Sequence, residues 1–214
     1  MRMIFKDRAD AGKQLAEALK DEFKDAKDTI VLALPRGGVA LGYEISKALN
    51  LPLDIIVPRK IGAEFNPEYA IGAITETGEA VWNETERKAA KPEYIKRIVA
   101  EEKAEAARRL KTYRGDRPSR NIENKTVILV DDGVATGLTM RAAIKTARAE
   151  KPKKIAVAVP HGAQDSLKKL REEVDELMVL DEPMFYGAVG AFYENFPQNT
   201  DEEVIKLLKE VKKP

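Results

Sequence analysis

The chain has 214 residues, of which 43% are hydrophobic and 34% are charged, a size and composition that suit one globular domain. Its 37 basic and 36 acidic residues nearly cancel, which argues against nucleic acid as a partner bound through net charge. The absence of cysteine excludes disulfide and thiolate chemistry, and a single histidine excludes HExxH and three-histidine zinc sites.

Apolar strand candidates alternate with helical patterns along the chain, which is typical of an α/β domain with a largely parallel sheet. The first half predicts a helix over 9–24, a strand over 29–34, a helix over 39–49, a strand over 53–57, and a hairpin over 69–74 and 79–82 outside the parallel sheet. The second half predicts a charged helix over 92–113, strands over 126–130, 155–159 and 177–180, and helices over 138–150 and 163–174 between them. Thr200 begins T-D-E-E, a capping-box spacing that predicts a last helix.

These elements predict a single domain over 1–214, with a helical insertion or mobile-loop region over 84–120 and a C-terminal hood and helix over 181–214. No apolar run reaches the roughly 18 residues that a membrane helix needs. The first 20 residues lack the apolar core of a signal peptide. We therefore expect a cytoplasmic protein without a membrane partner.

The most informative segment is 126–140, TVILVDDGVATGLTM. Asp131 and Asp132 follow an apolar strand at its carboxyl end, where open α/β sheets bind their ligands. Gly133 and Gly137 bracket a short turn, and the helix that follows offers free backbone N–H groups to an anion. No lysine follows Gly137 and the chain has no G-x-G, so the segment is neither a Walker A loop nor a dinucleotide fingerprint.

The two acids indicate which anion this loop would take. A pair of carboxylates repels a bare phosphate, but it accepts hydrogen bonds from sugar hydroxyls or faces a divalent cation. The segment therefore predicts a ribose 5-phosphate ligand. The structural alternative is an ordinary strand, turn and helix whose acids stabilise the helix N-terminus by up to about 1 kcal/mol.

This segment resembles the PRPP-binding motif of the type I phosphoribosyltransferases (PRPP is 5-phosphoribosyl 1-pyrophosphate). The similarity covers about residues 30–200. It implies the fold of that family, a central mostly parallel sheet flanked by helices, with a small hood. By position, it implies that Asp131 and Asp132 contact the ribose hydroxyls and are the catalytic acids. It also implies that the rest of the loop binds the phosphorylated ribose: Gly133, Val134, Ala135, Thr136, Gly137, Leu138 and Thr139.

The pyrophosphate of PRPP needs a site of its own. Pro35, Arg36, Gly37 and Gly38 follow the first predicted strand, and an arginine can bind phosphate oxygens bidentately. Family members hold pyrophosphate with such a loop, often through an unusual cis peptide. Arg59 and Lys60 follow the second predicted strand, and the resemblance makes them a second contact. The alternatives are a turn with a surface arginine and a solvated basic pair.

Arg59 and Lys60 also open R-K-x-G-x-x-x-N-P-E, a pattern of one uncharacterised phosphoribosyltransferase-like group, to which the similarity is closest. Asn66, Pro67 and Glu68 complete it. Asn66 and Glu68 could reach a base or a metal, or cap the hairpin, and we favour the structural role.

The acceptor is less well defined. In 6-oxopurine phosphoribosyltransferases an aspartate stands at the position of Ala135, and alanine there is closer to the adenine and uracil enzymes. The resemblance makes Phe185 the first candidate for stacking on a base and Tyr186 the second, and His161 could line the same cleft. A small aromatic lid and a buried strand-end histidine are the alternatives.

Two functions follow from this interpretation. The first is an enzyme that transfers the phosphoribosyl group of PRPP to a nitrogenous base or another nitrogen nucleophile. Mg²⁺ would arrive with PRPP, with Asp131 and Asp132 as its candidate protein ligands. The second is a non-catalytic sensor or regulator that binds PRPP or a nucleotide, which the missing acid at Ala135 favours. A homodimer is the candidate assembly.

Overall fold

The computed structural model describes residues 4–117 and 120–211, so residues 1–3, 118–119 and 212–214 of the predicted domain lie outside it. The elements in chain order are α1 (Arg8–Phe23), β1 (Thr29–Ala33), α2 (Gly37–Leu49), β2 (Leu53–Ile55), β3 (Arg59–Ala63), β4 (Asn66–Ile74), β5 (Ala80–Trp82), α3 (Glu84–Ala89), α4 (Pro92–Arg114), β6 (Thr126–Val130), α5 (Leu138–Ala149), β7 (Lys154–His161), α6 (Gln164–Glu173), β8 (Glu176–Asp181), the 3-10 helix η1 (Val189–Phe192) and α7 (Asp201–Lys209).

A five-stranded parallel sheet in the order β2-β1-β6-β7-β8 forms the centre of the molecule. β1 and β6 lie side by side, with Ala33 opposite Val130 at their carboxyl ends. From β1 the chain continues to β2 on one side, and from β6 it continues to β7 on the other. The strand order therefore reverses between β1 and β6, and ligands of open α/β sheets bind at such a point.

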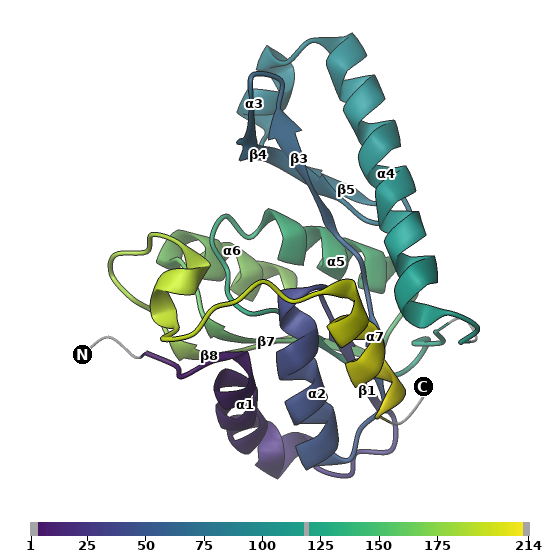
Figure 1. Cartoon of the computed structure of the whole chain (residues 1–214), viewed down its shortest axis with the longest axis vertical. Coiled ribbons are helices and arrows are strands. Elements are labelled where there is room, and N and C mark those ends of the chain that lie inside the picture. The colour runs from purple at the N-terminus through teal and green to yellow at the C-terminus, as the bar shows by residue number, and fades with distance from the viewer. Residues whose placement is uncertain (1–3, 118–119, 212–214) are drawn as a thin grey trace.

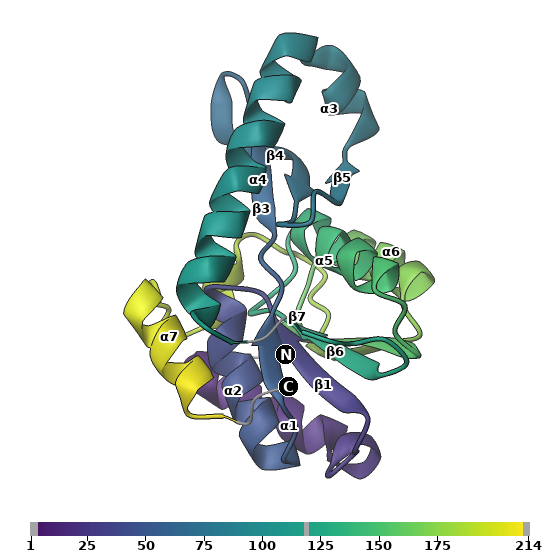
Figure 2. The same ribbon diagram turned by 90° about the vertical axis from the view of Figure 1, so that its right-hand side faces the viewer.

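Helices cover both faces of this sheet (Figure 2). Because side chains alternate along a strand, Val31 and Ile128 pack with α1 and α2, whereas Ile30 and Val127 pack on the opposite face with α5 and α6. Strands buried on both faces read as continuous apolar runs, which is why the runs at 29–34 and 126–130 are so uniform. The predicted fold class is confirmed.

A second, antiparallel sheet (β3-β4-β5) projects from the central sheet together with α3 and α4 (Figure 1). Ile61, Ile71 and Tyr94 form the apolar core between this sheet and α4. Ala73 packs against Leu138 of α5, so the base of the projection lies beside the helix that follows the acidic loop. The predicted hairpin is thus two strands of a three-stranded sheet.

The remaining differences concern segments with weak local signals. β3 was not predicted, and residues 59–60 lie in this strand rather than in a loop after β2. Its residues, RKIGA, have little apolar alternation, so pairing with β4 decides their conformation.

Two other predictions are confirmed. The capping box at Thr200 is present at the start of α7, which packs against α2 and α4. The helical character of 84–114 is also confirmed.

Candidate functional site

The loop after β6 is fixed in shape by β7 and α6. The backbone N–H of Val134 donates to His161 O at 3.0 Å, and Ala163 N donates to Val134 O at 2.8 Å. The hydroxyl of Ser166 donates to Ala135 O at 2.7 Å. The loop is therefore held to its neighbours by three hydrogen bonds that involve no side chain of its own.

The loop then opens α5 without a side-chain cap. Gly137 is the N-cap residue, with φ of +74°, a left-handed conformation that glycine adopts without strain. Ala135 and Thr136 are exposed just before it. The first N–H groups of a helix have no intrahelical acceptor. The N-terminus of α5 therefore offers an anion site next to the exposed Ala135 and Thr136.

The second loop, Pro35–Gly38, lies against the acidic pair. Leu34 N donates to Val130 O at 2.9 Å, and the peptide bond between Pro35 and Arg36 is cis. A methyl group on Gly37 would lie 1.9 Å from Asp132 Oδ2, and one on Gly38 would lie 2.6 Å from Val130 O. Both positions therefore require glycine, and the structure brings together the two loops that the sequence singled out.

Arg36 is the cation of this loop. It lies at the N-terminus of α2, and its Nη1 is 3.6 Å from Asp201 Oδ1 at the start of α7. The hydroxyl of Tyr113, near the end of α4, donates to the same oxygen at 2.7 Å. Burial and the bond to Asp201 raise the pKa of Tyr113 to about 12. Arg36 thus contacts α7 directly, through Asp201, and is linked to α4 through the bond between Asp201 and Tyr113.

The acidic pair is electrostatically unusual. Burial and the neighbouring carboxylate of Asp132 raise the pKa of Asp131 well above its usual range. Burial raises the pKa of Asp132 as well, and the guanidinium of Arg8 opposes that rise. Perturbed carboxylates at a strand end are common at functional sites because burial and close charges are what tune them.

Arg8, which the sequence analysis missed, is the partner of this pair. Its Nε donates to Asp132 Oδ2 at 2.7 Å, and the two side chains are 11% and 15% exposed. Arg8 is the first residue of α1, 124 positions before Asp132, so no local spacing connects them. Only the parallel sheet brings the start of α1 to the end of β6.

Arg59 and Lys60 are engaged with acids of the projecting part. Arg59 Nε donates to Glu102 Oε2 of α4 at 2.7 Å, and Lys60 Nζ donates to Glu68 Oε2 at 2.9 Å. Both basic residues, with Pro67 and Glu68, line a surface cavity of about 410 Å³ between this sheet and α4. The R-K-x-G-x-x-x-N-P-E segment therefore forms the β3–β4 hairpin with its own internal ion pair.

Aromatic residues gather behind the acidic loop. His161 is fully buried, stacks on Phe192 at 4.3 Å, and its Nδ1 lies within hydrogen-bond distance of the Tyr186 hydroxyl, at 2.9 Å. A methyl group on Gly133 would lie 2.5 Å from His161 Cε1, so the histidine ring contacts the back of the loop. Phe185, in contrast, is 87% exposed and is not part of the buried cluster.

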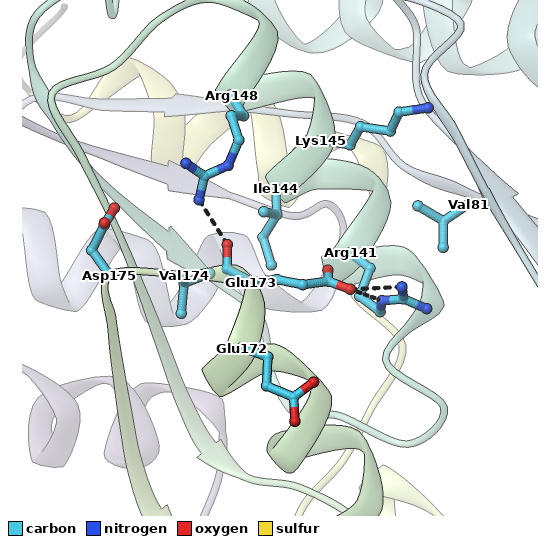
Figure 3. Close-up of a pocket in the computed structure, with 9 residues that line it drawn as sticks. All are labelled: Val81, Arg141, Ile144, Lys145, Arg148, Glu172, Glu173, Val174 and Asp175. Atoms are coloured by element: carbon cyan, nitrogen blue, oxygen red, sulfur yellow. Dashed lines mark hydrogen bonds and ion pairs between the residues drawn. The ribbon is translucent and has the colours of Figure 1, made fainter.

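A cavity of about 550 Å³ lies elsewhere, between α5 and the end of α6. Figure 3 shows Arg141 and Arg148 both directed at Glu173, whose carboxylate and carbonyl accept their hydrogen bonds. None of the predicted site residues lines it.

Among residues 4–117 and 120–211, no helix is both long and apolar enough to cross a membrane.

Comparison with known proteins gives consistent matches. Residues 3–193 match the family described as phosphoribosyl transferase domain. Proteins from two Mycobacterium tuberculosis strains, provisionally named phosphoribosyl transferases, are 40% identical over 210 residues, 96% of this chain and 46% of theirs. The chain thus spans about half the length of the curated relatives it matches. A crystal structure from Thermus thermophilus has 39% identity and a TM-score of 0.81, covering 98% of this chain and 99% of that one.

Proposed function

The chain belongs to the phosphoribosyl transferase domain family, and from this membership we propose that it transfers the 5-phosphoribosyl group of PRPP to a nitrogen nucleophile, with release of pyrophosphate. One observation carries the proposal. The Pro35–Gly38 loop and the Asp131–Gly137 loop meet at the point where the strand order reverses, with Gly37 against Asp132. The acceptor we favour is a nitrogenous base.

The 5-phosphate is assigned to the part of the loop from Ala135 to Thr139. Support comes from the uncapped N-terminus of α5, whose N–H groups and helix dipole favour an anion. The ribose hydroxyls are assigned to Asp131 and Asp132, since carboxylates are strong hydrogen-bond acceptors. Ala135 and Thr136 are exposed, which leaves the ligand a route to the loop.

The pyrophosphate is assigned to Arg36 and the adjoining Gly37 and Gly38. A guanidinium binds phosphate oxygens bidentately, and the glycines permit close approach of the backbone N–H groups. We keep Arg59 and Lys60 as a second contact, which requires them to exchange Glu102 and Glu68 for phosphate oxygens.

Magnesium fits this arrangement through the substrate rather than through a protein cage. Within the described part of the chain, no group of three or more His, Cys, Asp or Glu side chains could hold a metal ion. Mg²⁺ is usually bound by one or two carboxylates together with substrate phosphates, and Asp131 and Asp132 supply such carboxylates. When bound, the ion would neutralise charge on the departing pyrophosphate.

The proposed transfer separates charge, and the assigned residues stabilise the charge on each side. The bond between C1 of the ribose and the pyrophosphate oxygen breaks, and the electron pair leaves with the pyrophosphate. Arg36 stabilises that leaving group, and the acids beside the ribose stabilise the positive charge that develops on the sugar. The nitrogen nucleophile attacks C1 from the opposite side, with inversion. Tyr186 is proposed to line the acceptor side, with Phe185 as the exposed residue of the same segment. His161 is fully buried, so its proposed contribution is limited to its contact with the Tyr186 hydroxyl.

The second candidate is a PRPP-binding or nucleotide-binding sensor without turnover. The observation that favours it is Ala135, an exposed methyl group where the 6-oxopurine enzymes have an acid. Incubation with PRPP, Mg²⁺ and a panel of bases separates the two functions. Pyrophosphate release with one base supports the transferase, whereas PRPP binding without turnover on any base supports the sensor.

The binding assignment is tested by the double substitution Asp131→Ala and Asp132→Ala. We expect it to abolish calorimetric binding of PRPP, because the sugar loses both acceptors. Glu202→Ala, which removes an exposed acid of α7, serves as the control and should bind like the wild type. Unchanged affinity in the double variant would refute the assignment of the ribose to this pair.

A further inference from the structure

Arg8 is held on three sides. Its Nε donates to Asp132 Oδ2 at 2.7 Å, its Nη1 donates to Pro197 O at 2.6 Å, and its guanidinium lies 3.7 Å from the ring centroid of Phe196. A guanidinium fixed at two of its three nitrogens and on its face has one orientation. The carboxylate oxygen to which it donates therefore has a fixed position as well.

Asp132 is constrained from its other sides too. Tyr193 donates its hydroxyl to the backbone carbonyl of Asp132 at 2.7 Å. The Cα of Gly37 faces Oδ2 so closely that an added methyl group would meet it at 1.9 Å and would lie 3.1 Å from Arg8 Nε. Arg8 thus lies where the acidic loop and the Pro35–Gly38 loop touch.

Anchoring of the chain ends does not by itself account for the bond to Asp132. Residues 5–6 are already joined to residues 192–195 by backbone hydrogen bonds, including Phe5 N to Phe192 O and Glu194 N to Phe5 O, both at 2.8 Å. Arg8 also reaches Phe196 and Pro197, which follow directly, without using Asp132. The charged bond to Asp132 is an additional contact, and it is directed at an acid of the proposed ribose site.

We propose that Arg8 is a positioning residue for ribose recognition, which holds the carboxylate of Asp132 in the one orientation that accepts hydrogen bonds from the sugar. This inference rests on the proposed function. Arg8 acts through Asp132 and requires no contact of its own with the substrate.

Removing Arg8 leaves Asp132 Oδ2 without the donor that lies 2.7 Å from it, so the carboxylate is free to turn away from the ribose. Substitution by lysine keeps a positively charged donor at this position and should preserve part of the binding.

The experiment measures Mg²⁺-PRPP affinity by calorimetry at about pH 7, and the urea midpoint, for the wild type, Arg8→Gln and Arg8→Lys. Lys154→Gln is the control, because Lys154 forms a partly buried ion pair with Glu176 at the amino edge of the sheet, opposite the edge that carries the proposed ligand loops. We expect Arg8→Gln to weaken binding about tenfold or more, the fold-change that corresponds to a charge-assisted hydrogen bond of about 1.5–3 kcal/mol. Arg8→Lys should recover part of this loss.

Each outcome decides between the alternatives. Normal binding by Lys154→Gln, weakened binding by Arg8→Gln and partial recovery in Arg8→Lys support the proposal. A lower urea midpoint for Arg8→Gln with an unchanged PRPP affinity would overturn it in favour of a purely structural contact. If Arg8→Gln does not fold, retained affinity in Arg8→Lys supports the proposal, and a loss of affinity in a folded Arg8→Lys overturns it. Absence of PRPP binding by the wild type overturns the proposed function, and this inference with it.

Discussion

Replacing Gly37 with alanine places a methyl group against the carboxylate of Asp132. The new carbon would lie 1.9 Å from Oδ2 and 2.5 Å from Cγ, far inside van der Waals contact. The backbone of the first turn of α2 cannot withdraw easily, because Gly38 N donates to Leu34 O at 3.0 Å. The carboxylate must therefore turn away, and it loses its 2.7 Å bond to Arg8.

These contacts set the expected change in the free energy of unfolding and in PRPP binding. A hydrogen bond to a charged group contributes about 1.5–3 kcal/mol. An alanine in place of glycine returns about 0.4–1 kcal/mol through the unfolded state, because the φ of Gly37 is not in the left-handed region. We expect Gly37→Ala to lower the free energy of unfolding by about 1–2 kcal/mol, and to weaken PRPP binding about tenfold or more because Asp132 is displaced.

Gly38→Ala and Gly187→Ala make the test specific. A methyl group on Gly38 would meet the backbone carbonyl of Val130 at 2.6 Å, so it must push α2 from β6 and should cost about 1–3 kcal/mol. Nothing lies within 4 Å of a methyl group on Gly187, so that variant should remain within about 0.5 kcal/mol of the wild type. Equilibrium urea unfolding and calorimetry with PRPP measure both quantities. If Gly37→Ala binds PRPP as Gly187→Ala does, the position of Asp132 does not govern ribose binding.

Three further predictions concern other contacts of the described chain. The wild-type free energy of unfolding should fall as the pH rises from 10 towards about 12, because the folded state holds the pKa of Tyr113 at about 12. Tyr113→Phe should show a shallower fall in pH-dependent urea unfolding, since burial also raises the pKa of Tyr186 and Tyr193 and their contributions remain. Asp201→Asn should raise calorimetric affinity for pyrophosphate by up to about fivefold, since a partly exposed ion pair with Arg36 contributes about 0–1 kcal/mol, and a lower affinity would contradict this. Arg120→Ala should lower the free energy of unfolding by about 3–5 kcal/mol, because it leaves the buried Glu76 without its partner, and a loss under 1 kcal/mol in urea unfolding would contradict this.

The sequence predicted the elements whose signals are local. The apolar run at 126–130 and the glycines around it determine a buried strand, a turn and a helix through their own residues, and the capping box at Thr200 is similarly local. Both loops were predicted at the carboxyl ends of their strands, and parallel strands share that edge of the sheet. The particular contact of Gly37 with Asp132 was not predicted, because it depends on the pairing of β1 with β6.

Other contacts depend on residues far apart in the chain. Arg8 and Asp132 are 124 positions apart, and Tyr113 and Asp201 are 88 apart, so no pattern in a short window reveals them. Arg59 and Lys60 were expected in a loop because they follow Pro58 at the end of the strand predicted over 53–57, yet pairing with β4 makes them part of a strand. Such partners require knowledge of the fold, and pairing across it overrides local preference.

The bridge between Phe5 and Tyr193 has a consequence for how the molecule is made. Tyr193 and Pro197 emerge from the ribosome about 60 residues after Asp132, a delay of roughly 3–12 s at 5–20 residues per second. During that interval the nascent acidic pair lacks the hydroxyl of Tyr193, and Arg8 lacks its carbonyl acceptor at Pro197. The sheet can form as its strands are synthesised, but the surroundings of Asp132 are completed only when the two distant segments join. A chain stalled before residue 193 would carry two close carboxylates without this enclosure, so their mutual repulsion would be screened by water.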